Sequence, residues 1–174
     1  MDYREILSHR RSCRAFSSED VNGDDVRLLL RAALMSPTSR NTRSWQFVVV
    51  DERSTLDKLS DSKEQGAAFL RTAALAVVVL GDSLQNDCWV EDGAIAAVSM
   101  QYQAEELGLG SCWVQIRGRH LSDGTESEAV VRGILDIPDN MRVLCMVGFG
   151  HKEEEKSPHA EDDLKWENIH IDKY

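Results

Sequence analysis

The feature that most constrains the fold is a long apolar helix predicted from about Asp87 to Leu107. Its apolar and small residues make one stripe and then widen beyond an amphipathic face: Trp89, Val90, Gly93, Ala94, Ile95, Ala97, Val98, Met100, Ala104 and Leu107. A helix that is apolar on most sides is buried, either inside a domain or between subunits. Gly108 follows where glycine commonly ends a helix. The rest of the chain, or a second copy of it, must therefore cover this helix.

Helical and strand patterns alternate around the long helix. Helices are predicted over residues 2–10, 22–36, 53–59, 67–71 and 126–135, and strands over residues 45–50, 75–80, 111–116 and 141–147. The strand at 45–50 reads as buried, and the strand at 75–80 is apolar on both faces and should be central. Gly148-Phe149-Gly150 is expected to close the last strand. We expect one domain over residues 1–174, with a mixed sheet flanked by helices.

Charge and composition narrow the classes of function. A formal charge of −10 and a pI near 4.9 argue against nucleic acid or an anionic membrane as the main partner. No apolar run approaches the roughly 20 residues that span a bilayer, and the first residues lack a hydrophobic signal core, so a cytoplasmic protein is expected. The four cysteines are widely spaced without a zinc-type pattern, so we expect reduced thiols and no metal. A nucleophilic role for Cys13, among arginines, stays a minor alternative.

Common catalytic motifs do not occur in this chain. Two GxG runs, at residues 108–110 and 148–150, fail to complete the dinucleotide-binding GxGxxG between a strand and a helix. There is no P-loop and no GxSxG elbow. The five histidines lack metal-ligand spacing on a helix. The sequence therefore predicts no set of catalytic side chains.

A basic run stands out on this acidic chain. Residues 9–14 read His-Arg-Arg-Ser-Cys-Arg, which places three guanidinium groups beside a hydroxyl. Guanidinium groups bind phosphate in bidentate geometry, so a small anionic ligand is one interpretation. The other is an ordinary basic helix end, where the helix dipole favours cations.

A second polar segment, Ser36 to Trp45, lies between a predicted helix end and a predicted strand. Small hydroxyls, an amide and a rigid proline could form a wall for a flat heteroaromatic ligand. An ordinary polar turn with capping residues explains the same composition.

Taken together, three motifs resemble those of the nitroreductase-like flavin oxidoreductases. They are Arg10-Arg11-Ser12-x-Arg14, then Ser36-Pro37-Thr38-Ser39-x-Asn41-x-Arg43-Ser44-Trp45, then Gly108-Leu109-Gly110-Ser111-Cys112-Trp113 after a long helix. Their order and spacing agree with the family over most of the chain. In the second motif, Arg43-Ser44 stands where the family usually has Gln-Pro before the tryptophan. The resemblance implies an α+β fold, with a central, mostly antiparallel sheet flanked by helices, in an intertwined homodimer.

The same resemblance implies FMN as cofactor, with NADH or NADPH as reductant. Arg10, Arg11 and Ser12 would hold the phosphate, and Arg14 would lie near the pyrimidine edge of the flavin and tune it. Further implied cofactor contacts are Pro37, Thr38, Ser39 and Asn41 from the other subunit, backbone groups around Trp113, Val114 and Gln115, and Lys156 from the tail. Hydride would pass through the flavin to a nitroaromatic, quinone or similar acceptor in ping-pong order. The alternatives are a specialised reductase or dehalogenase of the same family, and a flavin-binding protein without catalysis.

Overall fold

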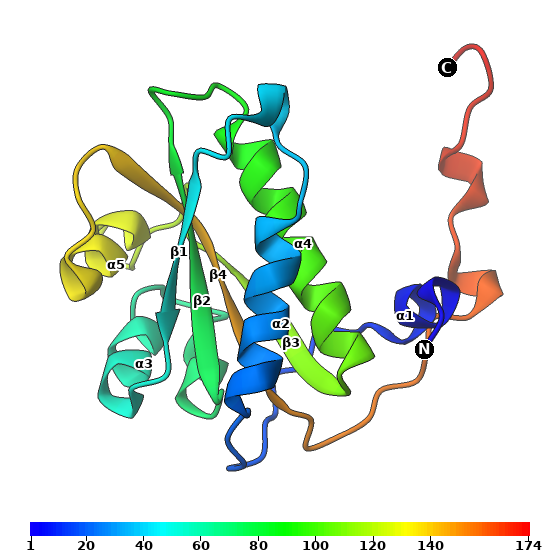
Figure 1. Ribbon diagram of the computed structural model, residues 1–174, viewed down its shortest axis with the longest axis horizontal. Coiled ribbons are helices and arrows are strands. Elements are labelled where there is room, and N and C mark those ends of the chain that lie inside the picture. Colours follow the sequence, from blue (N-terminus) through cyan, green and yellow to red (C-terminus); the bar gives the residue numbers. More distant parts are fainter.

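A four-stranded antiparallel sheet organises the chain (Figure 1). The computed structural model describes all 174 residues. The strands, in spatial order, are β1 (Trp45–Val50), β2 (Leu75–Asp82), β4 (Met141–His151) and β3 (Leu109–Gln115). Neighbouring strands pair antiparallel, and one isolated parallel bridge joins Ser12 to Ser111. The predicted α+β architecture with a mostly antiparallel sheet is confirmed.

The helices cover the two faces of the sheet. On one face lie α2 (Gly23–Leu34) and α4 (Trp89–Glu106), and α1 (Tyr3–His9) packs on the end of α4. On the other face lie α3 (Arg53–Ser60), α5 (Ser127–Leu135) and the short helix η2 (Ala68–Arg71) (Figure 1). The remaining short helices are η1 (Ser39–Asn41), η3 (Glu161–Asp163) and η4 (Trp166–Asn168).

Strand β2 shows how this layering follows from the sequence. Side chains alternate across a strand, and Val77 and Val79 join the core under α2 and α4, whereas Ala76 and Val78 join the core under α3 and α5. All eight residues of β2 are buried. The prediction that this strand is central is confirmed.

Local sequence signals placed most helix boundaries correctly. The side chain of Asp2 accepts a hydrogen bond from the backbone of Glu5, and Glu5 reciprocates in a capping box that begins α1. Asn22 caps α2 through the amide of Asp25. Gly108 follows α4 with a φ of +76°, a left-handed conformation that glycine adopts without strain.

Two strand predictions need correction. β1 is an edge strand, and only its terminal residues Trp45 and Val50 are buried, although an apolar run of this kind looks the same at an edge as in the centre. Gly148 and Gly150 do not close β4, because the strand continues through them to His151. A Cβ on Gly148 would lie 2.8 Å from Leu70 and Phe69, so these glycines allow close packing.

Two glycine substitutions should therefore have opposite effects. Gly148→Ala should lower the free energy of unfolding by about 1–3 kcal/mol, because the buried strand must move away from Leu70 and Phe69. Gly133→Ala, in α5 with open space around it, should raise the stability by up to about 1 kcal/mol through helix propensity. Urea unfolding of both variants measures this, and equal effects would contradict the packing role.

A buried carboxylate ties α5 to β4. Glu128 accepts hydrogen bonds from Nε and Nη2 of Arg142, at 2.6 and 2.8 Å, and from the amide of Val143 at 3.0 Å. Burial raises the pKa of Glu128, but these bonds outweigh it, so the pKa lies below its usual value of 4.5.

The ion pair of Glu128 and Arg142 should make the free energy of unfolding depend on pH in the acid range. A carboxyl with a depressed folded pKa contributes stability that is complete above its unfolded pKa and is lost as the pH falls through the folded pKa. Glu128→Gln should therefore destabilise the protein at neutral pH and flatten the loss of stability below about 4.5. Urea unfolding across this range checks the expectation, and parallel curves for variant and wild type would contradict it.

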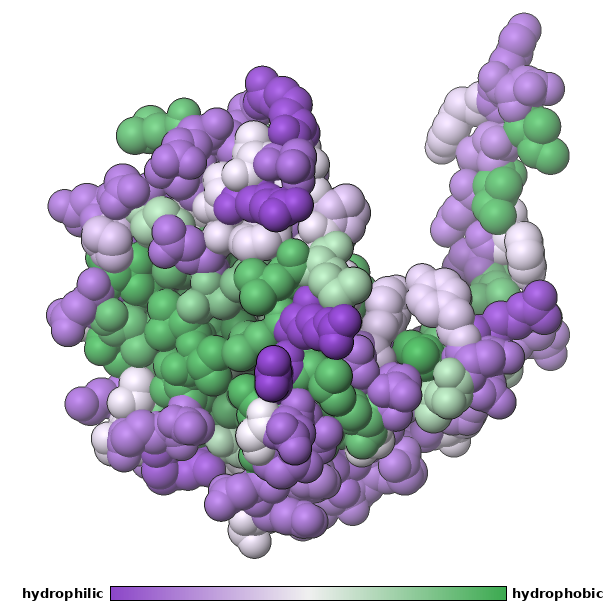
Figure 2. Space-filling model, viewed as in Figure 1, coloured by the Kyte–Doolittle hydropathy of each residue, from purple (hydrophilic) through white to green (hydrophobic).

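The C-terminal segment leaves the body of the molecule. From Glu153 to Tyr174 every residue is exposed. Residues 161–174 project away from the body, and we call them the C-terminal arm (Figure 1). Hydrophobic groups lie along this arm among polar ones (Figure 2). Its large apolar side chains are 44% to 106% exposed: Leu164, Trp166, Ile169, Ile171 and Tyr174. No helix combines the length and the apolar character that a membrane span requires.

Candidate functional site

The candidate site is built along the outer edge of β3. This strand is last in the sheet, and residues 10–16 run beside the start of its free edge. The amide of Cys13 donates to the carbonyl of Ser111 at 2.9 Å, so the backbone groups of Ser111 face outward. Because a strand alternates, the backbone groups of Trp113 and Gln115 face the same free edge. Unpaired backbone donors and acceptors are therefore available beside the basic run.

The arginines of that run have guanidinium groups without acidic partners. Arg10 is the C-cap of α1, and its backbone amide donates to Ile6, so the helix-end interpretation is correct for its position. None of the ion pairs in the structure involves Arg10, Arg11 or Arg14. The run can therefore be both a helix end and a cluster of positive charge. On a chain of net charge −10, arginine side chains without acidic partners favour a bound anion.

The chain after β4 returns to the same place. The amide of Glu153 donates to the carbonyl of Ala15 at 3.1 Å. Lys156 Nζ donates to the carbonyl of Ser12 at 2.6 Å, and Arg11 donates to the carbonyl of Ser157. The structure therefore places Lys156 beside the basic run, and its contact with a phosphate, which the resemblance implies, stays a prediction.

Cys112, a residue of the third motif, is buried near the positive charges of this cluster. Burial raises the pKa of the Cys112 thiol, and the positive charges of Arg14 and Lys156 act in the opposite direction. Burial also lowers the pKa of Lys63, and the nearby charge of Arg119 lowers it further.

The alternative of a nucleophilic Cys13 gains no support. Its side chain is buried, and the thiol is hydrogen-bonded to the carbonyl of Ala15 at 3.2 Å. It also packs against Gly110, where an added Cβ would lie 2.9 Å from the sulfur. Cys13 therefore acts as a packing residue between the basic run and β3.

The three predicted residues of β3 differ in their surroundings. Trp113 and Gln115 are half-buried, and Trp113 Nε1 donates to Gln115 Oε1 at 3.0 Å. Val114 is fully buried in the core under α3 and α5, and by the alternation of the strand its backbone groups face β4. The free edge thus offers the backbone of Trp113 and Gln115.

The loop of residues 37–44 lies at the opposite end of the molecule (Figure 1). The amide of Ser39 donates to Asp92, in the first turn of α4, whereas the basic run packs near the last turn of that helix. Eighteen helical residues separate these ends by roughly 27 Å. One chain does not bring Pro37, Thr38, Ser39 and Asn41 together with Arg10 and Arg14.

The molecule is thus an α+β protein with a cationic cluster at the free edge of its last strand. Comparison with known families matches residues 7–79 and 61–151 to the nitroreductase family. A protein of Archaeoglobus fulgidus, provisionally named an NADH dehydrogenase/NAD(P)H nitroreductase, is 32% identical over 98% of this chain and 97% of its own length. The chain belongs to the nitroreductase family, and the identification made from the three motifs is confirmed.

Solved structures agree with this assignment. An FMN-dependent nitroreductase from Clostridium difficile R20291 superposes with a TM-score of 0.96 at 38% identity, covering 98% of this chain and 99% of that one. A protein of Clostridium acetobutylicum, provisionally named an NADH oxidase, superposes with a TM-score of 0.88 at 29% identity, covering 97% and 99%.

Proposed function

We propose that this protein is an FMN-dependent oxidoreductase that passes hydride from NADH or NADPH to a small electrophilic acceptor such as a nitroaromatic or a quinone. The observation that carries the proposal is the set of guanidinium groups without acidic partners beside the free edge of β3. The Clostridium difficile structure, described as FMN-dependent, supports the choice of cofactor. Bound FMN supplies the hydride-transfer chemistry, so the protein needs no catalytic triad.

The residues present fit such a cofactor. The donors available for a phosphate are the positive charges of Arg10, Arg11 and Lys156 and the hydroxyl of Ser12. Lys156 donates to the backbone carbonyl of Ser12 and Arg11 to that of Ser157, so the two segments are bonded to each other. Arg14 places a positive charge beside Cys112, where it would stabilise negative charge on the pyrimidine edge. The outward backbone groups of β3 provide donors and acceptors for a heteroaromatic edge.

The site is completed by a second copy of the chain in this proposal. Pro37, Thr38, Ser39 and Asn41 lie too far from Arg14 to line the same ring within one subunit. A homodimer would bring the loop of one subunit to the basic run of the other. The reductant and the acceptor would then occupy the same open site in turn, in a ping-pong order.

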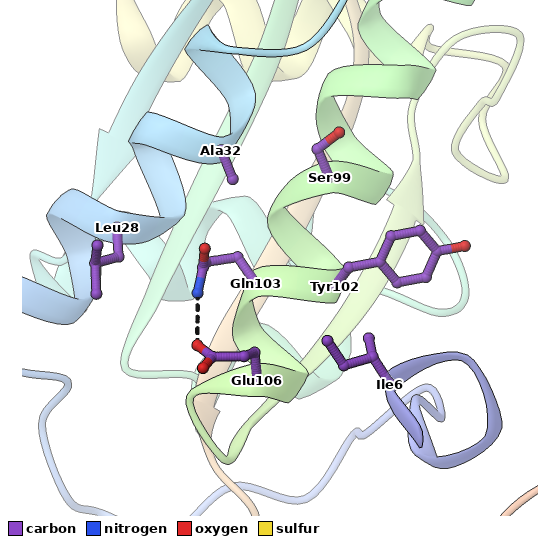
Figure 3. Close-up of a pocket in the computed structure, with 7 residues that line it drawn as sticks. All are labelled: Ile6, Leu28, Ala32, Ser99, Tyr102, Gln103 and Glu106. Carbon is purple, nitrogen blue, oxygen red and sulfur yellow. Dashed lines mark hydrogen bonds between the residues drawn. The ribbon is translucent and has the colours of Figure 1, made fainter. Parts of the chain in front are cut away.

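The exposed apolar surface supports such a dimer. A groove of about 580 Å³ lies between α1, α2 and α4 (Figure 3). It is lined by Ile6, Leu28, Ala32, Ser99, Tyr102, Gln103 and Glu106. Nearby, Leu34 and Met35 are 57% and 71% exposed. A second subunit that covers this surface and receives the C-terminal arm would bury apolar area that is now open to water.

A visible spectrum tests the function directly. Purified protein is mixed with FMN, dialysed, and then given NADH or NADPH without oxygen. Retained flavin bands that bleach with the nicotinamide would support the proposal, and adding candidate acceptors would then identify those that restore the colour. Retained bands that never bleach would favour a flavin-binding protein without this catalysis. A colourless protein would refute the cofactor assignment.

A further inference from the structure

We propose that Asp92 and Asn86 are positioning residues that hold the loop of residues 37–44 in the shape required to line the flavin, an inference that rests on the proposed function. The loop contains an unusual backbone. Arg40, Asn41 and Arg43 have φ values of 51°, 54° and 49°. Residues with side chains adopt this left-handed region at a cost of about 1–2 kcal/mol each. Such strain persists where the surrounding structure determines the conformation.

Asp92 fixes the beginning of the loop. Its side chain lies in the first turn of α4, and the residue is 3% exposed. One carboxylate oxygen accepts the amide of Ser39 at 2.8 Å, and the other accepts Nδ2 of Asn86 at 2.7 Å. No cation pairs with this carboxylate. A buried carboxylate without a cation depends on its hydrogen bonds, so the loop amide and the Asn86 amide are what satisfy it.

Asn86 contacts the end of the loop. It is 1% exposed, and its Nδ2 lies 3.2 Å from both the Thr42 and the Ser44 hydroxyl oxygens. Its Oδ1 accepts the amide of Cys88 at 3.0 Å, which fixes the orientation of the side chain before α4 begins. The Asp92–Asn86 pair therefore connects one helix end to both ends of the strained loop.

The other side-chain contacts of the loop are exposed, and they include bonds from the Arg43 amide to Thr38 Oγ1 at 3.1 Å and from Arg43 Nε to Asn41 Oδ1 at 3.0 Å. Arg40 donates to Asp87 at 2.6 Å, but the two side chains are 69% and 81% exposed. Exposed ion pairs contribute about 0–1 kcal/mol. The buried side chains of Asp92 and Asn86 are thus the ones that hold Ser39, Thr42 and Ser44 against the start of α4.

The first experiment compares two carboxylate-to-amide changes. Asp92→Asn places an amide opposite the amide of Asn86, so FMN affinity should fall by about tenfold or more. In the protein without FMN, hydrogen exchange of residues 39–44 should become faster. Asp87→Asn is the matched control and should change both readings by less than about fivefold. If Asp92→Asn leaves affinity and exchange at wild-type values, the inference is wrong.

A swap of the two residues separates positioning from general stability. In Asp92→Asn with Asn86→Asp, the amide at 92 can accept from Ser39 and donate to the carboxylate at 86, which can accept from the Thr42 and Ser44 hydroxyls because hydroxyl protons rotate. Affinity and slow exchange should return to within about threefold of wild type. A swap with wild-type melting temperature that restores neither reading would overturn the inference.

A loop variant covers the case in which Asp92→Asn does not fold. Ser39→Pro removes the amide that Asp92 accepts, at the first position of η1, and Thr38 has the extended backbone that proline requires of its neighbour. It should weaken FMN binding and speed exchange at Thr42 and Ser44, and unchanged values would count against the inference. If the wild type binds no FMN, the proposed function fails, whereas the exchange readings still judge the role of Asp92 and Asn86.

Discussion

Arg10→Ala should weaken FMN binding by about 10- to 100-fold, because a charge-assisted hydrogen bond contributes roughly 1.5–3 kcal/mol. The fold should survive, since Arg10 uses only its backbone amide to end α1. Fluorescence titration of FMN gives the dissociation constant. The melting temperature without cofactor should stay at the wild-type value.

Arg4→Ala is the matched control for this change. Arg4 is an exposed arginine on the same helix, six residues before Arg10 and outside the basic run. Its loss alters the net charge equally, so any general electrostatic effect should appear in both variants. An Arg10→Ala protein that stays fully yellow through dialysis, or an equal loss in Arg4→Ala, would remove Arg10 from the phosphate site.

Deleting residues 161–174 should weaken the dimer by at least about tenfold, since burying even one of the large apolar side chains of the arm contributes about 1.5–3 kcal/mol. Five such side chains lie exposed in this segment. The body of the subunit should fold normally, because the arm buries none of its own residues. Analytical ultracentrifugation over a range of concentrations measures the dissociation constant of the dimer.

A point variant distinguishes apolar contact from simple length. Trp166→Ala keeps the arm but removes one of its large side chains, and should weaken the dimer in the same direction as the deletion. FMN affinity should fall with dimer content in both proteins. A truncated protein that remains a dimer of wild-type affinity would show that the arm does not hold the second subunit.

Local patterns predicted the helices and strands well, but not the arrangement of the strands. Capping residues at Asp2 and Asn22 and the apolar run of β2 act within a few residues, so the sequence displays them directly. The order β1-β2-β4-β3 depends on pairing between distant segments. For the same reason the exposure of β1 was missed. In the sequence, the glycines of β4 indicated the end of the strand. In the structure they allow close packing against Leu70, Phe69 and Phe16.

The candidate site shows the same limit. The basic run belongs to a motif and the return of Lys156 followed from the family resemblance, and the structure places the two side by side. The Asp92–Asn86 pair was missed because Asp92 sits among apolar positions of a helix whose apolar stripe dominated the pattern. Whether these residues contact FMN stays a prediction.

The length of α4 has a genetic consequence. Because it keeps the basic run and the 37–44 loop at opposite ends of one subunit, each site of the proposed dimer would join the two halves from different chains. A subunit carrying Arg10→Ala and a subunit carrying Asp92→Asn, mixed as a heterodimer, would place both defects in one site and leave the other intact. Two alleles that each weaken FMN binding would then complement one another when expressed together, because one site of the heterodimer would bind FMN with wild-type affinity, which two self-contained sites with one defect each could not do.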